Sequence, residues 1–370
     1  MLSVVGAKGG KFMTSGKKVA CHFSVLIFLL CLIFLLSLSL GYANSSLLEV
    51  CKVFLGKSDA TMSFIVTQIR LPRILACMLG GGSLAMSGVL LQTLTKNPLA
   101  DSGILGINAG AGLVIAIMVG LLDVTNSMMI ALMPFLAMLG GILTICTVYF
   151  VSRQKNQPIS PTRLIITGVG ISSLLSGIMI SIIANLDTSK TDYIVSWLSG
   201  KVSGGNWQTL MILAPLLLVT WLLTYSRSYA LNIMSLNEET AIALGLNLKR
   251  ERLYTLILST ALAALSVVLV GNITFIGLLA GHITRQLLGS DHRISLPSSL
   301  LIGMIIFLIA DTIGRVCLVG TGIPTGLVVA VIGAPYFLYL MIKNNVNCPM
   351  DLTRFLIFRL MKNLSTGQVF

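Results

Sequence analysis

The stretch QIRLPRILACMLGGGSLAMSGVLLQTLTKNPLADSGILGINAGAG, residues 68–112, joins an arginine-flanked, glycine-rich apolar segment to a polar Asn-Pro turn. The apolar segment 71–94 is long enough to cross a bilayer, because a spanning helix needs about 20 mostly apolar residues. The turn at Asn97 and Pro98 separates it from a second apolar run that begins at Ile104. The stretch therefore predicts two membrane-spanning helices joined by a short polar turn, an arrangement typical of transporters.

The composition of the whole chain is that of an integral membrane protein. Of its 370 residues, 55% are apolar and 10% are charged, and the mean hydropathy is +0.95. In soluble domains about a quarter of the residues are charged. The lengths of the apolar runs and the lack of alternation exclude a transmembrane β-barrel. We predict an all-α integral membrane protein with about ten transmembrane helices. The expected spans are 19–43, 71–94, 104–122, 128–151, 164–185, 209–225, 253–271, 273–289, 296–318 and 324–342.

The span at 273–289 is the weakest of these predictions, because it carries His282 and Arg285. No long repeat and no low-complexity linker divides the chain, which favours one ten-helix domain over residues 19–345. The apolar run that starts at Val19 is longer than the core of a signal peptide, about 7–15 residues, so we expect a retained first helix.

The distribution of positive charge predicts how the chain crosses the membrane. Most of the 25 Lys and Arg residues fall on the side that holds the N-terminus, and loops rich in these residues stay in the cytoplasm. We therefore expect both termini to be cytoplasmic, with residues 1–18 forming a basic flank and residues 346–370 a tail. The net charge of +13 then reflects orientation and contact with anionic lipid, not nucleic acid.

The sequence offers little for chemistry on the chain itself. The 12 acidic residues lie almost wholly in predicted loops, with Asp311 alone near a span end, whereas ion-coupled carriers usually need ionisable groups at membrane depth. The seven cysteines and three histidines have no metal-binding or catalytic spacing. We expect no catalytic residue, no metal and no cofactor on this chain, and an energy source outside it.

The cytoplasmic connection SRSYALNIMSLNEETAIALGLNLKRER, residues 226–252, contains a helix of about two turns. Asn237 is a suitable N-cap, Glu238 and Glu239 suit the positive end of the helix dipole, and Gly245 suits a left-handed stop. Such a helix is too short to cross a bilayer, so it is either a docking element for a cytosolic protein or an interfacial helix. Its apolar residues are Ala241, Ile242 and Leu244.

The glycine pattern of the second span has two readings. Small residues from Gly80 to Gly88 let neighbouring backbones approach closely in lipid, and tight helix packing is the simpler interpretation. The same small residues would also suit the lining of a pore. Periodicity does not separate the two.

Charged residues at the outer ends of two spans also have alternative roles. Arg70 and Arg73 precede the second helix, and Asp311 and Arg315 stand four residues apart in the ninth. They could anchor the helices at the interface. An exposed guanidinium at Arg70 or Arg315 would suit carboxylates of a partner, and Asp311 could equally neutralise Arg315 within the helix.

Several further motifs occur along the chain in a fixed order. They are Arg70-Leu71-Pro72-Arg73, Ser87-Gly88 with Gln92, Asn97-Pro98-Leu99-Ala100, Leu105-Gly106-Ile107 with Gly110-Ala111, Ala243-Leu244-Gly245, Phe275-Ile276-Gly277-Leu278, Asp291-His292-Arg293, Ala310-Asp311 with Arg315, and Ile332-Gly333-Ala334-Pro335. Together they resemble the permease subunit of the iron-siderophore, haem and vitamin B12 ABC importers, over roughly residues 60–345. The chain departs from that pattern at Gly281, where relatives commonly have proline.

This resemblance implies a ten-helix subunit of a bacterial cell membrane that dimerises with a copy or a paralogue around a translocation path. Two cytosolic ABC ATPases would hydrolyse ATP-Mg below it, and an extracytoplasmic substrate-binding protein would dock from outside. The resemblance places Arg70 and Arg315 at the docking site for that protein. It also makes the segment 238–246 the coupling helix of the ATPase. Its expected contact residues are Glu238, Glu239, Ala241, Leu244 and Gly245.

The substrate implied by the loop NPLADSGILGINAGAG is a ferric siderophore, with haem and cobalamin as alternatives within the same family. Three other classes stay open on the residues alone: an ion-coupled secondary transporter, a channel and a membrane scaffold. The lack of buried carboxylates argues against the first of these.

Overall fold

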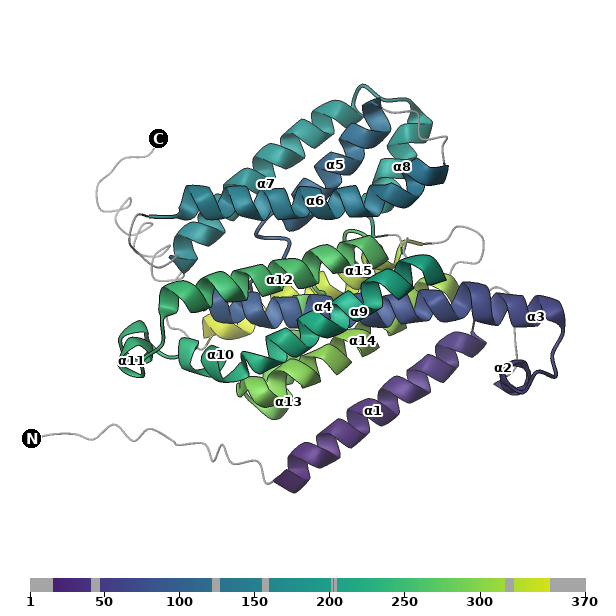
Figure 1. Cartoon of the computed structure of the whole chain (residues 1–370), viewed down its shortest axis with the longest axis horizontal. Coiled ribbons are helices and arrows are strands. Elements are labelled where there is room, and N and C mark those ends of the chain that lie inside the picture. The colour runs from purple at the N-terminus through teal and green to yellow at the C-terminus, as the bar shows by residue number, and fades with distance from the viewer. Residues whose placement is uncertain are drawn as a thin grey trace, which may run out of the picture. The chain divides into compact units, whose positions relative to one another are not determined.

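A computed structural model describes residues 16–40, 47–121, 127–154, 160–200, 202, 205–316 and 323–346 (Figure 1). The chain forms two compact units, Met1–Ala330 and Val331–Phe370, of which the first holds every described helix except the end of the last one. Within the described part of the chain every regular element is a helix. The elements are α1 (Gly16–Ser39), α2 (Leu47–Phe54), α3 (Ala60–Phe64), the π-helix η1 (Ile65–Arg70), α4 (Leu71–Thr95), α5 (Ile107–Leu121), α6 (Ser127–Ser152), α7 (Pro161–Ile183), α8 (Thr188–Leu198), α9 (Trp207–Ser226), α10 (Ser228–Met234), α11 (Glu238–Ala243), α12 (Leu248–Val270), α13 (Ile276–Leu288), α14 (His292–Val316) and α15 (Thr325–Val346).

Each of the predicted spans coincides with a helix, which confirms the all-α membrane class. Seven helical stretches in the described residues are long and apolar enough to cross a membrane. Helix α5 and the apolar part of α15, Thr325–Tyr339, are shorter, and α13 has only 13 residues. The number of crossings and the cytoplasmic location of the termini stay predictions, and most of the two terminal flanks lies outside the described residues.

The second span begins earlier than the sequence predicts. One continuous helix of 36 residues runs from Ala60 to Thr95, with the π-helical turn η1 just before Pro72. Proline has no N–H to donate, and its ring clashes with the carbonyl four residues earlier. The wider turn accommodates this, since the Leu71 N–H bonds to the Val66 carbonyl five residues back. Arg70 therefore lies inside a helix.

Helix α4 is the centre of the first unit (Figure 1), where it packs against α9, α12, α13 and α14. Its glycines face other backbones directly. A Cβ atom at Gly88 would lie 2.4 Å from the Cα of Gly277, and one at Gly81 would lie 2.7 Å from the carbonyl oxygen of Gly303. Both distances are shorter than atoms can approach, so these positions require glycine. The tight-packing interpretation is confirmed for them.

A break in the helical path between α12 and α13 explains why the eighth span is short. Gly271 and Phe275 have positive φ angles of 74° and 69°. Backbone groups exposed by such a break need partners where lipid replaces water. The turn after α4 and the start of α5 supply them: Asp101 Oδ2 accepts from the Phe275 N–H at 3.1 Å, and Asn108 Nδ2 donates to the Ile273 carbonyl at 3.4 Å.

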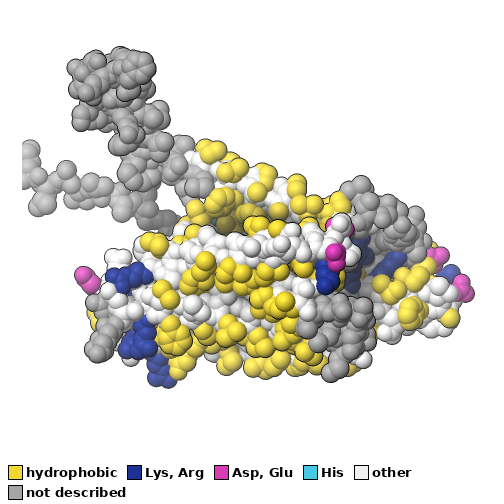
Figure 2. Space-filling model, turned by 90° about the horizontal axis from the view of Figure 1, so that it is seen from above, with side chains coloured by type: hydrophobic (Ala, Val, Ile, Leu, Met, Phe, Trp, Pro, Cys, Tyr) yellow, Lys and Arg dark blue, Asp and Glu magenta, His cyan; other side chains and the backbone are white. Residues whose placement is uncertain are grey.

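The outer surface of the bundle is apolar. Figure 2 shows hydrophobic side chains over the middle of the visible face and Lys and Arg side chains toward its ends. In the most apolar windows of α1 and α7 only 11% of the residues are buried, so these helices present their apolar side chains outward. Such a surface suits contact with lipid acyl chains.

We predict that Gly88→Ala strongly destabilises the protein, because the new methyl group has no space against Gly277. Overpacking of this kind costs about 1–3 kcal/mol. The matched control is Gly103→Ala, where the atom nearest to the new Cβ is Thr274 Cγ2 at an ordinary contact distance of 3.4 Å. Thermal melting in detergent should show a lower Tm for the first variant and an unchanged or higher Tm for the second. Equal melting temperatures would contradict the packing argument.

Candidate functional site

At one end of the first unit, three arginines gather from η1, α4 and α14, and those of α4 and α14 bond one buried carboxylate. Asp311 is fully buried. Its Oδ1 accepts from Arg73 Nη2 at 2.8 Å and from Thr325 Oγ1 at 3.0 Å, and its Oδ2 accepts from Arg315 Nε at 2.8 Å. The expected neutralisation of Arg315 by Asp311 within the helix is confirmed.

Two of these arginines also hold the last turn of α1. Arg70 Nη1 donates to the carbonyl of Leu38 at 2.7 Å, and Arg315 Nη2 donates to Ser37 Oγ at 2.6 Å. Cations are favourable at a helix C-terminus, where carbonyls have no partner within the helix. Arg70 is only 5% exposed, so the expectation of an exposed guanidinium there is wrong for this chain by itself. The docking role of Arg70 and Arg315 stays a prediction.

At the opposite end of the bundle, α11 ends as the sequence predicts. Gly245 has a φ of +82°, and its N–H bonds to the carbonyl of Ile242 at 2.9 Å while the Leu246 N–H bonds to that of Ala241 at 3.0 Å. These two bonds form a Schellman motif, which satisfies the free carbonyls at the helix end. Asn237 occupies the N-cap position and its carbonyl accepts from the Ala241 N–H at 2.9 Å, but its side chain makes no cap hydrogen bond to the helix.

A buried arginine fixes α11 against the start of α12. Arg252 is 1% exposed, and its Nη2 donates to Glu238 Oε1 at 2.6 Å, a bond that lowers the pKa of Glu238. Ala241 is fully buried, in an apolar cluster with Leu231 and Leu248. Of the predicted contact residues, Glu238 and Ala241 therefore hold the helix in place. Glu239 and Gly245 are exposed.

Two large apolar side chains stand on the surface that α11 and its C-cap offer to another molecule. Ile242 is 60% exposed and Leu244 is 59% exposed. Because the Glu238–Arg252 pair and the Schellman turn fix the helix on both sides, these side chains stand on a rigid element. Rigid presentation lowers the entropy cost of binding a partner.

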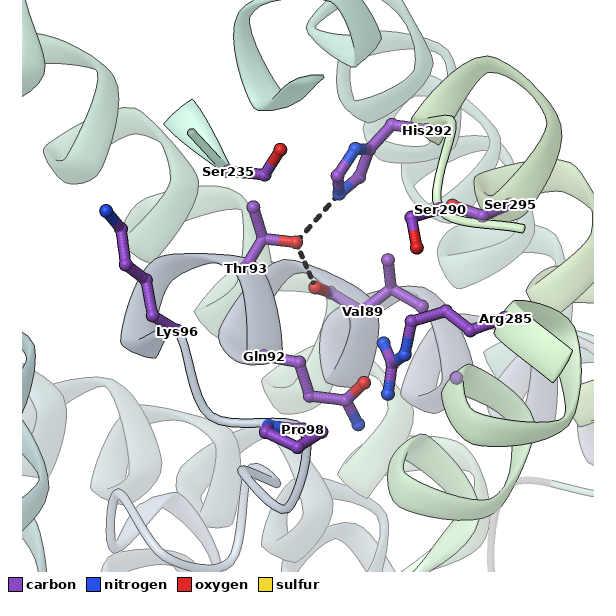
Figure 3. A pocket seen from close by; sticks show the side chains of 11 residues that line it. Val89, Gln92, Thr93, Lys96, Pro98, Ser235, Arg285, Ser290, His292 and Ser295 are labelled. Carbon is purple, nitrogen blue, oxygen red and sulfur yellow. Dashed lines mark hydrogen bonds between the residues drawn. The ribbon is translucent and has the colours of Figure 1, made fainter. Parts of the chain in front are cut away.

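A cavity of about 270 Å³ lined by several polar residues lies beside this connection, among α4, α13, α14 and the link from α10 to α11 (Figure 3). His292 Nε2 is 2.7 Å from Thr93 Oγ1, and His292 Nδ1 is 2.7 Å from Asn232 Oδ1. Lys96 Nζ donates to the carbonyl of Leu236 at 2.8 Å. These contacts tie the end of α4 and the start of α14 to the α10–α11 region.

Sequence reasoning gave no role to the residues around this cavity. Asn232, which links α10 to α14, also donates to Asp291 Oδ1 at 2.8 Å. Hydrogen bonds from Arg293 and Asn232 lower the pKa of Asp291 to about 2, so this carboxylate is ionised at neutral pH and already engaged. The motif Asp291-His292-Arg293 was the only part of this hydrogen-bond network that stood out in the sequence. Its partners, Thr93 and Asn232, come from distant segments.

The structure is an apolar helical bundle with backbone-to-backbone glycine contacts. Its helical path is broken between α12 and α13, and the short helix α11 stands rigidly at one end. These features define a multi-pass membrane protein of the transport-permease class. The chain belongs to the FecCD transport family, whose model matches residues 29–343. The resemblance inferred from the ordered motifs is thereby confirmed.

Named relatives cover nearly the whole chain. The iron(3+)-hydroxamate import system permease protein FhuG of Bacillus subtilis is 34% identical, across 90% of this chain and 99% of the relative. The ferric enterobactin transport system permease protein FepD of Escherichia coli is 37% identical, across 85% and 93%. The hemin transport system permease protein HmuU of Yersinia pestis is 35% identical, across 84% and 94%. All three are permease subunits rather than enzymes.

A solved structure supports the same fold. A metal-chelate type ABC transporter in an inward-facing conformation matches with a TM-score of 0.74 and 28% sequence identity, across 88% of this chain and 99% of that one. The chain thus has the fold of an ABC transporter permease.

We predict that Asp311→Asn destabilises the protein, because it leaves Arg73 and Arg315 close together without their carboxylate. Removing one partner of a buried ion pair costs about 3–5 kcal/mol. The control is Asp187→Asn, an exposed residue before α8 whose side chain caps nothing. Melting curves in detergent should show a large loss for the first variant alone, and a wild-type Tm for Asp311→Asn would mean that the cluster adds no stability.

Proposed function

We propose that this chain is the permease subunit of an ATP-driven importer of ferric siderophores in the bacterial cell membrane. The observation that carries the proposal is the FecCD match over residues 29–343, together with relatives named for ferric hydroxamate and enterobactin transport. The permease pairs with a copy or a paralogue, two cytosolic ABC ATPases and an extracytoplasmic binding protein. ATP-Mg is bound and hydrolysed on the ATPases, and the permease itself carries no cofactor.

Haem is the second candidate substrate, because the hemin permease HmuU is as similar to this chain as the siderophore permeases are. An ion-coupled secondary transporter is not favoured. The two buried carboxylates, Asp101 and Asp311, have structural partners in the Phe275 backbone and in two arginines. Neither is free to carry an ion across the membrane.

Helix α7 supports a translocation path between two permease subunits. Gly170, Ser173, Gly177 and Ser181 recur at spacings of three or four residues and are all exposed. A Cβ atom at Gly170 or Gly177 would meet nothing within 4 Å. Lipid-facing helices usually present large apolar side chains, whereas small residues and hydroxyls suit close helix contacts or a polar path. We assign this face to the subunit interface.

The coupling role belongs to Ile242 and Leu244, with Glu238, Glu239, Ala241 and Gly245 keeping α11 in position and shape. In this proposal the exposed pair enters a cleft of the ATPase, and closure of the ATPases on ATP moves α11 as a rigid body. That motion biases the permease between outward-open and inward-open states.

Docking of the binding protein uses Arg70 and Arg315 at the end that holds the Asp311 cluster. Both guanidinium groups already have acceptors on α1, so carboxylates of the binding protein replace some of these contacts or add to them. An ionised acceptor forms a stronger hydrogen bond than a neutral carbonyl, which favours the exchange.

We predict that Leu244→Asp weakens the association with the ATPase at least about tenfold, because it places a charge in an apolar contact that partner binding would desolvate. The control is Asn247→Asp, which adds the same charge three residues away and keeps an N-cap on α12. Co-purification with the ATPase and ATP-dependent transport should both fall for Leu244→Asp only. Unchanged association would refute the coupling role.

The function is tested by uptake of radiolabelled iron in cells with and without this chain. Iron is presented as hydroxamate and catecholate siderophores and as haem, alongside labelled cobalamin. Deletion should abolish uptake of a ferric siderophore. Loss of haem or cobalamin uptake alone would keep the permease assignment and change the substrate, and unaltered uptake of every compound in a strain without paralogues would reject the proposal.

A further inference from the structure

Arg285 has an unusual position at the α11 end of the bundle. Its Nη2 atom is buried and has no hydrogen-bond partner among the described residues. The residue as a whole is half-buried, but a charged N–H group withdrawn from water without an acceptor is costly. The atom belongs to a side chain that lines the cavity of about 270 Å³, and Figure 3 shows it pointing from α13 toward Gln92 on α4.

The cavity is electropositive. None of the 11 residues drawn around it is acidic (Figure 3), and they include the cations Arg285 and Lys96. Burial lowers the pKa of His292 to about 4, so this ring adds no charge at neutral pH. The nearby carboxylates of the described residues are already engaged: Asp291 accepts two hydrogen bonds from Arg293 at 3.1 and 2.8 Å through Oδ2, and Glu238 accepts from Arg252. Among the residues that the structure describes, the cavity therefore offers Arg285 no anion.

The remaining lining groups are small and polar. Ser290 and Ser295 each offer a hydroxyl, and Gln92 Oε1 is a buried acceptor with no hydrogen-bond partner in the described part of the chain. Gly281 keeps this arrangement possible, since a Cβ there would lie 2.6 Å from Gln92 Oε1. A ligand that accepts hydrogen bonds from arginine and serines and donates one to Gln92 would satisfy the site.

We propose that this cavity binds a phosphate group, with Arg285 as its main ligand. Arginine suits phosphate because its planar N–H groups can bond two oxygens at once. A protonated phosphate oxygen, or a hydroxyl on the group that carries the phosphate, matches the free acceptor of Gln92. Lys96, whose amino group points away from Arg285 in Figure 3, adds positive charge at the rim.

The position of the cavity names two sources for that phosphate. We expect this end of the bundle to face the cytoplasm, and basic pockets between membrane helices on that side bind the head groups of anionic lipids. Soluble phosphate from the cytosol could enter the same space. Bound phosphate would connect α4, α13 and the start of α14 beside Ser235, three residues before α11. This binding claim does not depend on the substrate proposed above.

The test uses the purified full chain in two arms. In the first, the protein is placed in nanodiscs of phosphatidylcholine with increasing phosphatidylglycerol, and in the second it is titrated in detergent with inorganic phosphate at constant ionic strength. A ligand that binds only the folded state raises the Tm. We expect a rise in at least one arm, and retention of phosphatidylglycerol by the protein through delipidation would identify the lipid as the source.

Two variants and one control complete the test. Arg285→Gln should weaken phosphate binding, read from the rise in Tm, about tenfold. Ser290→Trp should abolish the rise in Tm, because the large side chain fills the cavity from an exposed position. Ser290→Trp carries the test if Arg285→Gln does not fold. Arg250→Gln, which removes an exposed charge at the same end outside the cavity, should respond like the wild type.

The proposal is overturned if neither phosphatidylglycerol nor phosphate shifts the Tm, or if both cavity variants respond like the wild type. It is also overturned if Arg285→Gln leaves the phosphate response intact but weakens association with the ATPase, because Arg285 would then be waiting for a carboxylate of that partner.

Discussion

The contact between Gly88 and Gly277 is the constraint on which the rest of the first unit depends. In lipid the hydrophobic effect does not drive apolar helices together, so close packing and polar contacts must hold them. With only 2.4 Å between a Cβ at Gly88 and the Cα of Gly277, α4 and α13 meet backbone to backbone. A Cβ at Gly277 would also lie 2.7 Å from Asp101 Oδ1. The same glycine thus lets Asp101 reach the broken backbone at Phe275.

The broken backbone in turn determines how the helices are arranged at the end of the bundle that carries α11. Because α13 begins only at Ile276, it is short, and the turn at Asp291 and His292 comes directly against α10 through Asn232. The cavity around Arg285 and the support of α11 both follow from this arrangement. A polar loop next to α4 therefore decides how the end of the bundle that carries α11 is built.

Local features of this architecture could be predicted from the sequence. The left-handed stop at Gly245 depends only on the helix that it ends. The pairing of Asp311 with Arg315 depends only on their spacing of four residues. The burial of Arg70, the partners of Asp101 and the surroundings of Arg285 depend on segments far away in the sequence, which no periodicity encodes. The early start of the second helix was missed because the π-turn that accommodates Pro72 has no simple sequence signature.

The arginines at the two ends of the first unit have different kinds of hydrogen-bond acceptor. At the end that carries α11, Arg252 and Arg293 pair with Glu238 and Asp291 of the same chain. Arg285 has no such carboxylate partner among the described residues. At the opposite end Arg70 and Arg315 hold the last turn of α1, a helix of which only 11% of the most apolar window is buried. In the proposed complex, a carboxylate that engages either arginine competes with the carbonyls of α1. Docking of a binding protein is then coupled to the hold on α1, because the same guanidinium groups serve both.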